Sequence, residues 1–166
     1  MKEALNIVWL KRDLRLQDHL PFFEAEHDLK CNYLPIYIME PSAMAYQDCS
    51  LRHLQFVYHS IVEMNRVLKA FNRKVCLLHG EAIEVFNFLI EKFDIQNVYS
   101  YQESGVKVTW DRDKNISSLF KRKGIKWTEF QRDGIIRGIK NRVNWDKNWY
   151  ATVNSPLILN VYSQNE

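Results

Sequence analysis

Two patterns of apolar residues alternate along the chain. Short apolar runs predict buried strands, and longer stretches with apolar residues three and four positions apart predict amphipathic helices. The second run contains Pro35, which has no N–H for a sheet ladder, but its neighbours are strong strand formers. Strands alternating with helices are the order of βαβ units, so we expect an α/β fold with a mostly parallel sheet. The predicted strands are residues 5–10, 32–38, 75–78, 98–101 and 126–130.

Helices are predicted between these strands. The clearest begins after Ser50, a favourable N-cap residue, and its apolar stripe should lie on the sheet. Thr109 is predicted to cap a later helix over residues 110–123, which Gly124 should end in the left-handed conformation. The stripe after Ser50 is Leu54, Val57, Tyr58, Ile61, Met64, Leu68 and Phe71; a helix after Gly80 should bury Ile83, Phe86, Leu89, Ile90 and Phe93; a short helix is expected near residues 21–27.

Beyond Phe130 the alternation stops, and irregular chain with one short helix is predicted. The final segment, residues 155–166, contains Leu157, Ile158, Leu159, Val161 and Tyr162 with no following element to cover them. Two interpretations stay open: a connector whose packing partner lies outside this chain, or a last element docked on this same domain. We expect part of the apolar surface over residues 145–162 to be exposed.

Composition indicates a single globular domain. The chain has 166 residues, of which 46% are apolar and 26% charged. We expect the α/β domain to cover residues 1–135 and a connector to cover residues 136–166. The net charge is +3, but residues 121–147 contain nine basic residues against three acidic ones. Such a band suits a nucleic-acid surface or a solvated face, and the usual exposure of lysine and arginine favours the second.

Three cysteines, Cys31, Cys49 and Cys76, argue against a disulfide framework because their number is odd and no C-x-x-C spacing occurs. The start of the chain lacks the pattern of a signal peptide, and no apolar run approaches the ~18 residues of a membrane span. We therefore expect a cytoplasmic protein that does not enter a membrane.

Familiar catalytic and phosphate-binding motifs are absent from the sequence, which has no G-x-G-x-x-G, no G-x-x-x-x-G-K-[ST] and no G-x-S-x-G. Cys49 and His53 lie four positions apart, but two ligands do not make a zinc site, which normally needs three or four. We expect no metal and no catalytic residue in this chain.

Charged residues gather where three predicted strands end, at residues 11–18, 39–41 and 101–105. Parallel strands bring such loops to one edge of the sheet, where open α/β sheets usually place their ligands. The first loop also has a plainer interpretation, in which Asp13, Arg15 and Asp18 only pair with one another.

A planar ligand at this edge would lie against apolar rings and side chains, with charged groups at its polar rim. Plain structural roles compete with this hypothesis: a core position for Trp9, an exposed first-turn position for Arg52 and an ordinary loop position for Glu103. The ligand-binding candidates are Trp9, Lys11, Arg12, Met39, Glu40, Arg52, Phe56 and Glu103.

The same segments resemble signatures of the photolyase/cryptochrome family. The run IVWLKRDLRLQDHLPF over residues 7–22 is similar to the end of that family's first strand, with Leu10 and His19 as departures. Four further resemblances follow in the family's order: residues 37–41, residues 50–53 with Phe56, residues 77–81, and residues 103–105 with 111–113. The residues that fit the family's structural signature are Asp13, Arg15, Asp18, Arg112 and Asp113.

This resemblance implies a three-layer, doubly wound (Rossmann-like) fold in which a five-stranded parallel sheet carries helices on both faces. In the family this domain precedes a helical domain that holds FAD and acts on damaged DNA, and nothing in this chain matches that domain. The chain looks like the N-terminal domain alone, so we do not assign Trp145 and Trp149 to the family's electron-transfer tryptophans.

The resemblance also implies a function. In family members the α/β domain often holds a light-harvesting pigment, which is a folate, a deazaflavin or a second flavin. We therefore expect a light-harvesting or scaffold domain of a deoxyribodipyrimidine photolyase-like flavoprotein, with the isolated chain inactive in repair. The alternatives are a cryptochrome-like blue-light receptor domain and a free-standing nucleotide-binding or interaction module.

Overall fold

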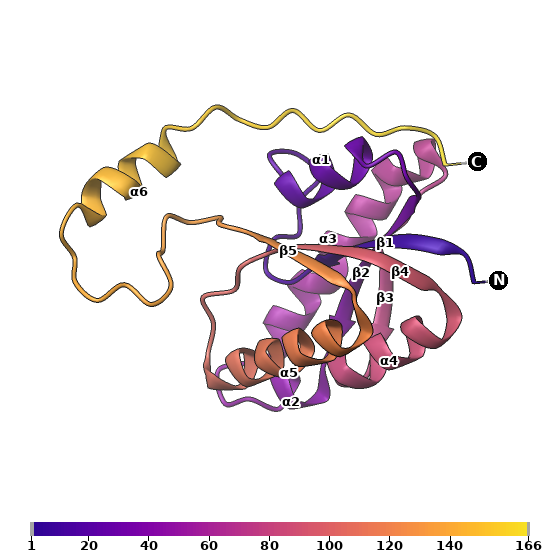
Figure 1. Ribbon diagram of the computed structural model, residues 1–166, viewed down its shortest axis with the longest axis horizontal. Coiled ribbons are helices and arrows are strands. Elements are labelled where there is room, and N and C mark those ends of the chain that lie inside the picture. Colours follow the sequence, from indigo (N-terminus) through magenta and orange to yellow (C-terminus); the bar gives the residue numbers. More distant parts are fainter. Residues whose placement is uncertain (1, 166) are drawn as a thin grey trace.

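The computed structural model describes residues 2–165 and contains a five-stranded parallel sheet in the order β3-β2-β1-β4-β5 (Figure 1). All five predicted strands are confirmed, although β4 begins earlier than predicted and β3 is displaced by one residue. Pro35 lies where β2 has a neighbour on one side only, because β3 pairs with β2 from Ile36 onward. The strands are β1 (Ala4–Leu10), β2 (Asn32–Met39), β3 (Cys76–His79), β4 (Asp94–Tyr101) and β5 (Lys126–Phe130).

Helices connect the strands in the predicted order. The α-helices are α1 (Leu20–His27), α2 (Pro41–Met44), α3 (Leu51–Leu68), α4 (Ala82–Lys92), α5 (Lys107–Lys123) and α6 (Trp145–Val153), and a 3₁₀ turn, η1 (Lys69–Phe71), follows α3.

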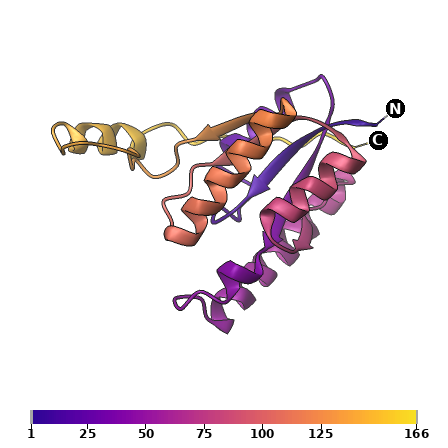
Figure 2. The same ribbon diagram turned by 60° about the horizontal axis from the view of Figure 1, so that its bottom comes forward.

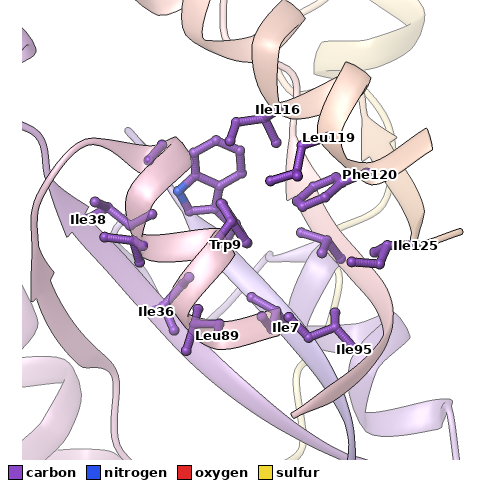
Figure 3. Packing of buried hydrophobic residues seen from close by; sticks show 14 residues of the cluster. Ile7, Trp9, Ile36, Ile38, Leu89, Ile95, Ile116, Leu119, Phe120 and Ile125 are labelled. Atoms are coloured by element: carbon purple, nitrogen blue, oxygen red, sulfur yellow. The ribbon is translucent and has the colours of Figure 1, made fainter. Parts of the chain in front are cut away.

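The central strand β1 contributes to two hydrophobic cores. Ile7 and Trp9 pack with α4 and α5 on one face of the sheet (Figure 3), while Val8 and Leu10 pack with α1 and α3 on the other. Helices on both faces give the three-layer, doubly wound architecture that the resemblance implied. The strand order reverses between β1 and β4, so a crevice is expected where these two strands end.

Helix α3 lies on the sheet only through its C-terminal half, where Ile61, Met64 and Leu68 are buried. The prediction that its whole apolar stripe lies on the sheet was wrong for Tyr58, which is 55% exposed. The first half of α3 instead borders the cavity described below, which explains why Leu54 and Val57 are half-buried.

The predicted start of α5 was also wrong. The helix begins at Lys107, and Thr109 lies in its first turn, where its hydroxyl donates to the carbonyl oxygen of Val106 at 2.9 Å. A threonine hydroxyl bonded to a carbonyl three residues earlier is compatible with helical backbone. Gly124 ends the helix in the left-handed conformation, with φ of 70°, as predicted.

After β5 the chain makes an excursion and returns (Figure 1). Residues 131–155, which we call the arm, project from the body and contain α6. Residues 156–165, which we call the strap, then run back past α1 (Figure 1), and the turned view of Figure 2 shows the arm projecting from the body. The strap buries Asn160 and Tyr162 and exposes Leu157, Leu159 and Val161 by 83%, 74% and 72%. The predicted exposed apolar surface is confirmed, and one face of the segment docks on this domain. The boundary between residues 135 and 136 stays a prediction.

The basic residues of the predicted band do not form one surface. Those at the end of α5 and the start of β5 lie at the amino-terminal edge of the sheet, whereas the arm follows the carboxyl end of β5. Residues 2–165 contain no helix that is both long and apolar enough to cross a membrane.

Candidate functional site

The loop after β1, residues 11–19, is built around the buried carboxylate of Asp13. Its Oδ1 accepts the backbone N–H of Lys11 at 2.9 Å, and its Oδ2 lies 2.7 Å from Nε2 of His19. The His19 Nδ1 accepts the backbone N–H of Phe22 at 3.2 Å, so the ring proton lies on Nε2 and His19 caps α1. Burial raises the pKa of Asp13, but the contact with His19, the hydrogen bond from the Lys11 N–H and the nearby Arg132 together outweigh it and hold that pKa below its usual value.

His19, where this sequence differs from the family signature, therefore has a structural role. Arg15 pairs with Asp18 at 3.3 Å, as the plainer interpretation expected, whereas Asp13 pairs with His19.

Arg112, in the second turn of α5, joins the buried carboxylates of Glu40 and Glu103 and the half-buried carboxylate of Asp113. Its guanidinium lies 2.8 Å from Glu40, 2.5 Å from Glu103 and 2.9 Å from Asp113. Burial lowers the pKa of Arg112, but the adjacent carboxylates outweigh it and raise that pKa. Burial also raises the pKa of Glu103, but the charge and hydrogen bond of Arg112, together with the charges of Lys11 and Arg12, outweigh it and lower that pKa. Desolvation prevails at Glu40, whose pKa is raised despite Arg112.

Lys11 extends the same group of charges toward the rings of Trp9 and Trp127. Its Nζ lies 4.4 Å from the ring centroid of Trp9 and 5.1 Å from that of Trp127, and it pairs with Asp113 at 3.2 Å. Cation–π contacts of this kind stabilise a charge that burial desolvates. Burial nevertheless lowers the pKa of Lys11.

Together these groups form a charge network whose formal charges cancel. Arg12 pairs with Glu103 at 2.9 Å, and Arg137 pairs with Glu129 at 3.4 Å. The network has as many cations as carboxylates, so a ligand beside it need not supply a counter-charge. Its members are Lys11, Arg12, Arg112 and Arg137 with Glu40, Glu103, Asp113 and Glu129.

A glycine allows Glu103 to reach both arginines. A Cβ built on Gly105 would lie 2.2 Å from the hydroxyl oxygen of Thr109 and 2.9 Å from a carboxylate oxygen of Glu103. Real side chains do not approach so closely, so the Glu103 position requires glycine at residue 105.

A cavity of about 580 Å³ opens beside the network at the carboxyl edge of the sheet. The loops after β1 and β2, the first half of α3 and the start of α5 enclose it. Its apolar wall includes Trp9, Tyr37, Met39, Tyr46, Leu54 and Phe56, and its polar wall includes Arg12, Glu40, Glu103 and Arg112.

Most residues singled out from the sequence meet at this cavity. Arg52 does not: it is exposed and lies outside the lining. Asp18 and Asp113 of the structural signature also lie outside it. The candidates that line the cavity are Trp9, Lys11, Arg12, Met39, Glu40, Phe56 and Glu103, with Asp13, Arg15 and Arg112 of the signature. Their role in holding a ligand stays a prediction.

Several lining residues were missed, among them Tyr46, Asp48 and Cys49. They lie between α2 and α3, where the sequence has no periodicity to place them; Tyr37, by contrast, lies on a predicted strand beside Met39. Among residues 2–165, no three His, Cys, Asp or Glu side chains gather as a metal site would require.

Comparisons with known proteins agree with this architecture. The DNA photolyase family model matches residues 6–143. A deoxyribodipyrimidine photo-lyase of Salmonella typhimurium is 28% identical over 131 residues, which are 79% of this chain and 24% of that protein. Cryptochrome-1 of Aedes aegypti is 22% identical over 129 residues, which are 75% of this chain and 24% of that protein.

Solved structures show the same fold at low sequence identity. An archaeal photolyase from Sulfolobus tokodaii, described with two FAD molecules that imply a novel light-harvesting cofactor, has a TM-score of 0.74 at 18% identity and covers 96% of this chain. A Synechocystis cryptochrome has a TM-score of 0.76 at 16% identity and covers 99% of this chain. The chain corresponds to 37% and 38% of those two chains.

The chain thus spans about a quarter of the curated relatives named above. The family model covers most of the described residues, and the cavity lies at the strand ends where the family signatures converge. The chain therefore belongs to the DNA photolyase family and has the fold of the N-terminal α/β domain of photolyases and cryptochromes.

Proposed function

We propose that this chain is the light-harvesting and scaffold domain of a deoxyribodipyrimidine photolyase-like flavoprotein. The observation that carries the proposal is the cavity of about 580 Å³ at the carboxyl edge of the sheet, with an apolar wall facing a neutral charge network. A planar pigment, either a folate, a deazaflavin or a flavin, suits this arrangement.

The cavity fits such a pigment in size and chemistry. Its volume lies within the ~300–1,000 Å³ typical of small-molecule sites, and such sites combine apolar walls with a few placed polar groups. The flat faces of the ring would contact Tyr37, Met39 and Phe56, while its polar edge would meet Arg12 and Glu103. Trp9 is only 1% exposed, so it would support the cavity wall from the core. A bound pigment would supply light absorption, and these residues would hold it rigidly.

The partners we propose are a helical FAD domain of the same protein and, through the whole protein, damaged DNA. The exposed outer face of the strap, Leu157, Leu159 and Val161, supports this proposal because stable domains rarely leave such a stripe uncovered. Absorbed energy would pass from this domain to reduced flavin, whose electron splits a pyrimidine dimer. The isolated chain would not repair dimers, since the flavin belongs to the other domain.

A cryptochrome-like receptor domain is the second candidate, favoured by the matches to cryptochromes of Aedes aegypti and Gallus gallus, each 22% identical. The two functions are separated by blue-light repair of dimer-containing DNA by the full-length protein: repair supports a photolyase, and light-dependent partner binding without repair supports a receptor.

The pigment proposal is tested by titrating the purified chain with FMN, a deazaflavin and methenyltetrahydrofolate, with fluorescence anisotropy as the readout. We expect saturable binding of one of the three. Phe56→Ala should weaken it about 2- to 10-fold, because aromatic contacts contribute ~0.5–1.5 kcal/mol. Phe56 is 71% exposed, so its loss should not unfold the chain.

Arg52→Ala is the matched control, since Arg52 lies on the same helix but outside the cavity lining. The affinity of Arg52→Ala for the pigment should equal that of the unmodified chain. Failure of all three pigments to bind would contradict the proposal, as would equal losses in the two variants.

A further inference from the structure

The strap and the loop after β1 are joined by reciprocal amide hydrogen bonds. The side chain of Asn160 accepts the backbone N–H of His19 at 2.9 Å and donates to the His19 carbonyl oxygen at 2.9 Å. The side chain of Gln17 in turn donates to the Asn160 carbonyl oxygen at 2.9 Å and accepts its N–H at 3.1 Å. Each side-chain amide thus satisfies both backbone groups of a residue on the opposite segment.

Further bonds fix the register of the two segments. The backbone N–H of Asp18 donates to the Ile158 carbonyl oxygen at 2.9 Å, and the Ile158 N–H donates to Oδ1 of Asp18 at 3.2 Å. Asp18 has φ of 54°, a left-handed conformation that these bonds help to hold. The hydroxyl of Tyr162 donates to the Leu16 carbonyl oxygen at 2.7 Å.

The joined loop is also a wall of the cavity. Asp13, Leu14 and Arg15 line the cavity, and Asp13 is bonded to the ring of His19, whose backbone Asn160 holds. Asn160 is 5% exposed, so displacing it would leave buried polar groups of both segments without partners. The strap therefore contacts the cavity wall through its inner face while its outer face is apolar and exposed.

We propose that Asn160 is a positioning residue, which couples docking of the strap to the shape of the cavity wall. A ligand that needs the ordered loop stabilises the docked strap, and the docked strap raises affinity for that ligand by the same factor. The ligand part rests on the proposed function, whereas the link between strap and loop rests on the hydrogen bonds alone. A ligand in the cavity would thereby stabilise the docked position of the strap, which carries the exposed residues Leu157, Leu159 and Val161.

The test is Asn160→Ala, followed by amide hydrogen exchange resolved over residues 14–19 and 158–162. Exchange in residues 14–19 should accelerate about tenfold or more, because buried polar groups lose their partners. Asn165→Ala is the matched control: Asn165 lies on the strap, and its backbone bonds reach Phe71 and Asn72, not the loop. It should leave residues 14–19 unchanged.

Gln17→Ala tests whether a change in the loop loosens the strap. Gln17 is exposed, so its loss should leave the core intact. Exchange in residues 158–162 should then accelerate. Should Asn160→Ala release residues 158–162 while residues 14–19 keep their protection, or should Gln17→Ala leave the strap unaffected, the coupling does not exist.

The effect of a bound ligand on exchange in the strap distinguishes coupling between cavity and strap from a bond that only holds the strap in place. A saturating concentration of whichever of FMN, the deazaflavin and the folate binds should slow exchange of residues 158–162 in the unmodified chain and in Asn165→Ala, and should have no such effect in Asn160→Ala. If FMN, the deazaflavin and the folate all fail to bind, the proposed function fails, while the exchange measurements without ligand still decide whether strap and loop are coupled.

Discussion

Removal of the Arg112 guanidinium should destabilise the domain by about 3 kcal/mol. Arg112→Met keeps most of the side-chain volume but strips a partner from Glu40, Glu103 and Asp113, whose side chains are only 6%, 5% and 13% exposed. Breaking a buried ion pair from one side costs ~3–5 kcal/mol. We expect the lower end because Lys11 still pairs with Asp113 and Arg12 with Glu103.

The stability lost in Arg112→Met should depend on pH. In the unmodified chain the pKa of Glu103 is lowered by Arg112, so its contribution is present above the unfolded pKa of about 4.3 and disappears as the pH falls through the folded pKa. Without Arg112, only the Lys11 and Arg12 charges oppose the effect of burial, so the pKa of Glu103 should rise and its stabilising contribution at neutral pH should be lost. The difference in stability between the two chains should therefore be largest near neutral pH and shrink on acidification.

Urea unfolding followed by circular dichroism at several pH values measures the free energy of unfolding that Arg112→Met loses and its dependence on pH. Arg66→Met is the control, because Arg66 pairs with Glu63 through side chains that are 73% and 65% exposed, and such pairs contribute under about 1 kcal/mol. An Arg112→Met loss no greater than that of Arg66→Met, or a loss that grows on acidification, would refute the account of the network.

Two more predictions use the same unfolding assay. Gly105→Ala should cost ~1–3 kcal/mol, because its Cβ would meet the Thr109 hydroxyl and the Glu103 carboxylate. Adding Thr109→Ala should recover part of that loss, since the contact with Glu103 remains; a double variant no better than the single one would point to another cause. Asp13→Asn should cost ~1–3 kcal/mol at pH 7, because it weakens the contact with His19. The difference from the unmodified chain should begin to narrow below the unfolded pKa of about 3.9, where the unfolded chain takes up a proton at Asp13 while the folded chain does not; a constant difference down to pH 2 would contradict the lowered pKa.

Local patterns in the sequence were sufficient to predict most of the fold. Apolar runs located all five strands, and the charged ends of β1, β2 and β4 pointed to one sheet edge, because parallel strands must end together. The helix boundary at Thr109 failed because a threonine hydroxyl can bond within the first turn as well as cap it. The exposed position of Arg52, outside the cavity lining, could not be read from helical spacing, which does not show how far a helix extends past the sheet.

Long-range pairing was beyond sequence reasoning. Nothing local marks Asn160 as the partner of His19, 141 positions away. The family resemblance treated His19 as a departure, and only the structure shows that its two nitrogens join Asp13 to the start of α1. Polar residues that satisfy one another across the fold leave no periodicity in the sequence.

The central place of β1 in the sheet has a consequence for synthesis on the ribosome. One side of β1 pairs with β2, but Leu5 on its other side pairs with Ile95. At ~5–20 residues per second, about 90 further residues delay that partner by roughly 5 to 18 seconds. During this interval the nascent chain carries an apolar strand with one open edge, a template for pairing with other chains. Slowed translation before β4 would lengthen that exposure.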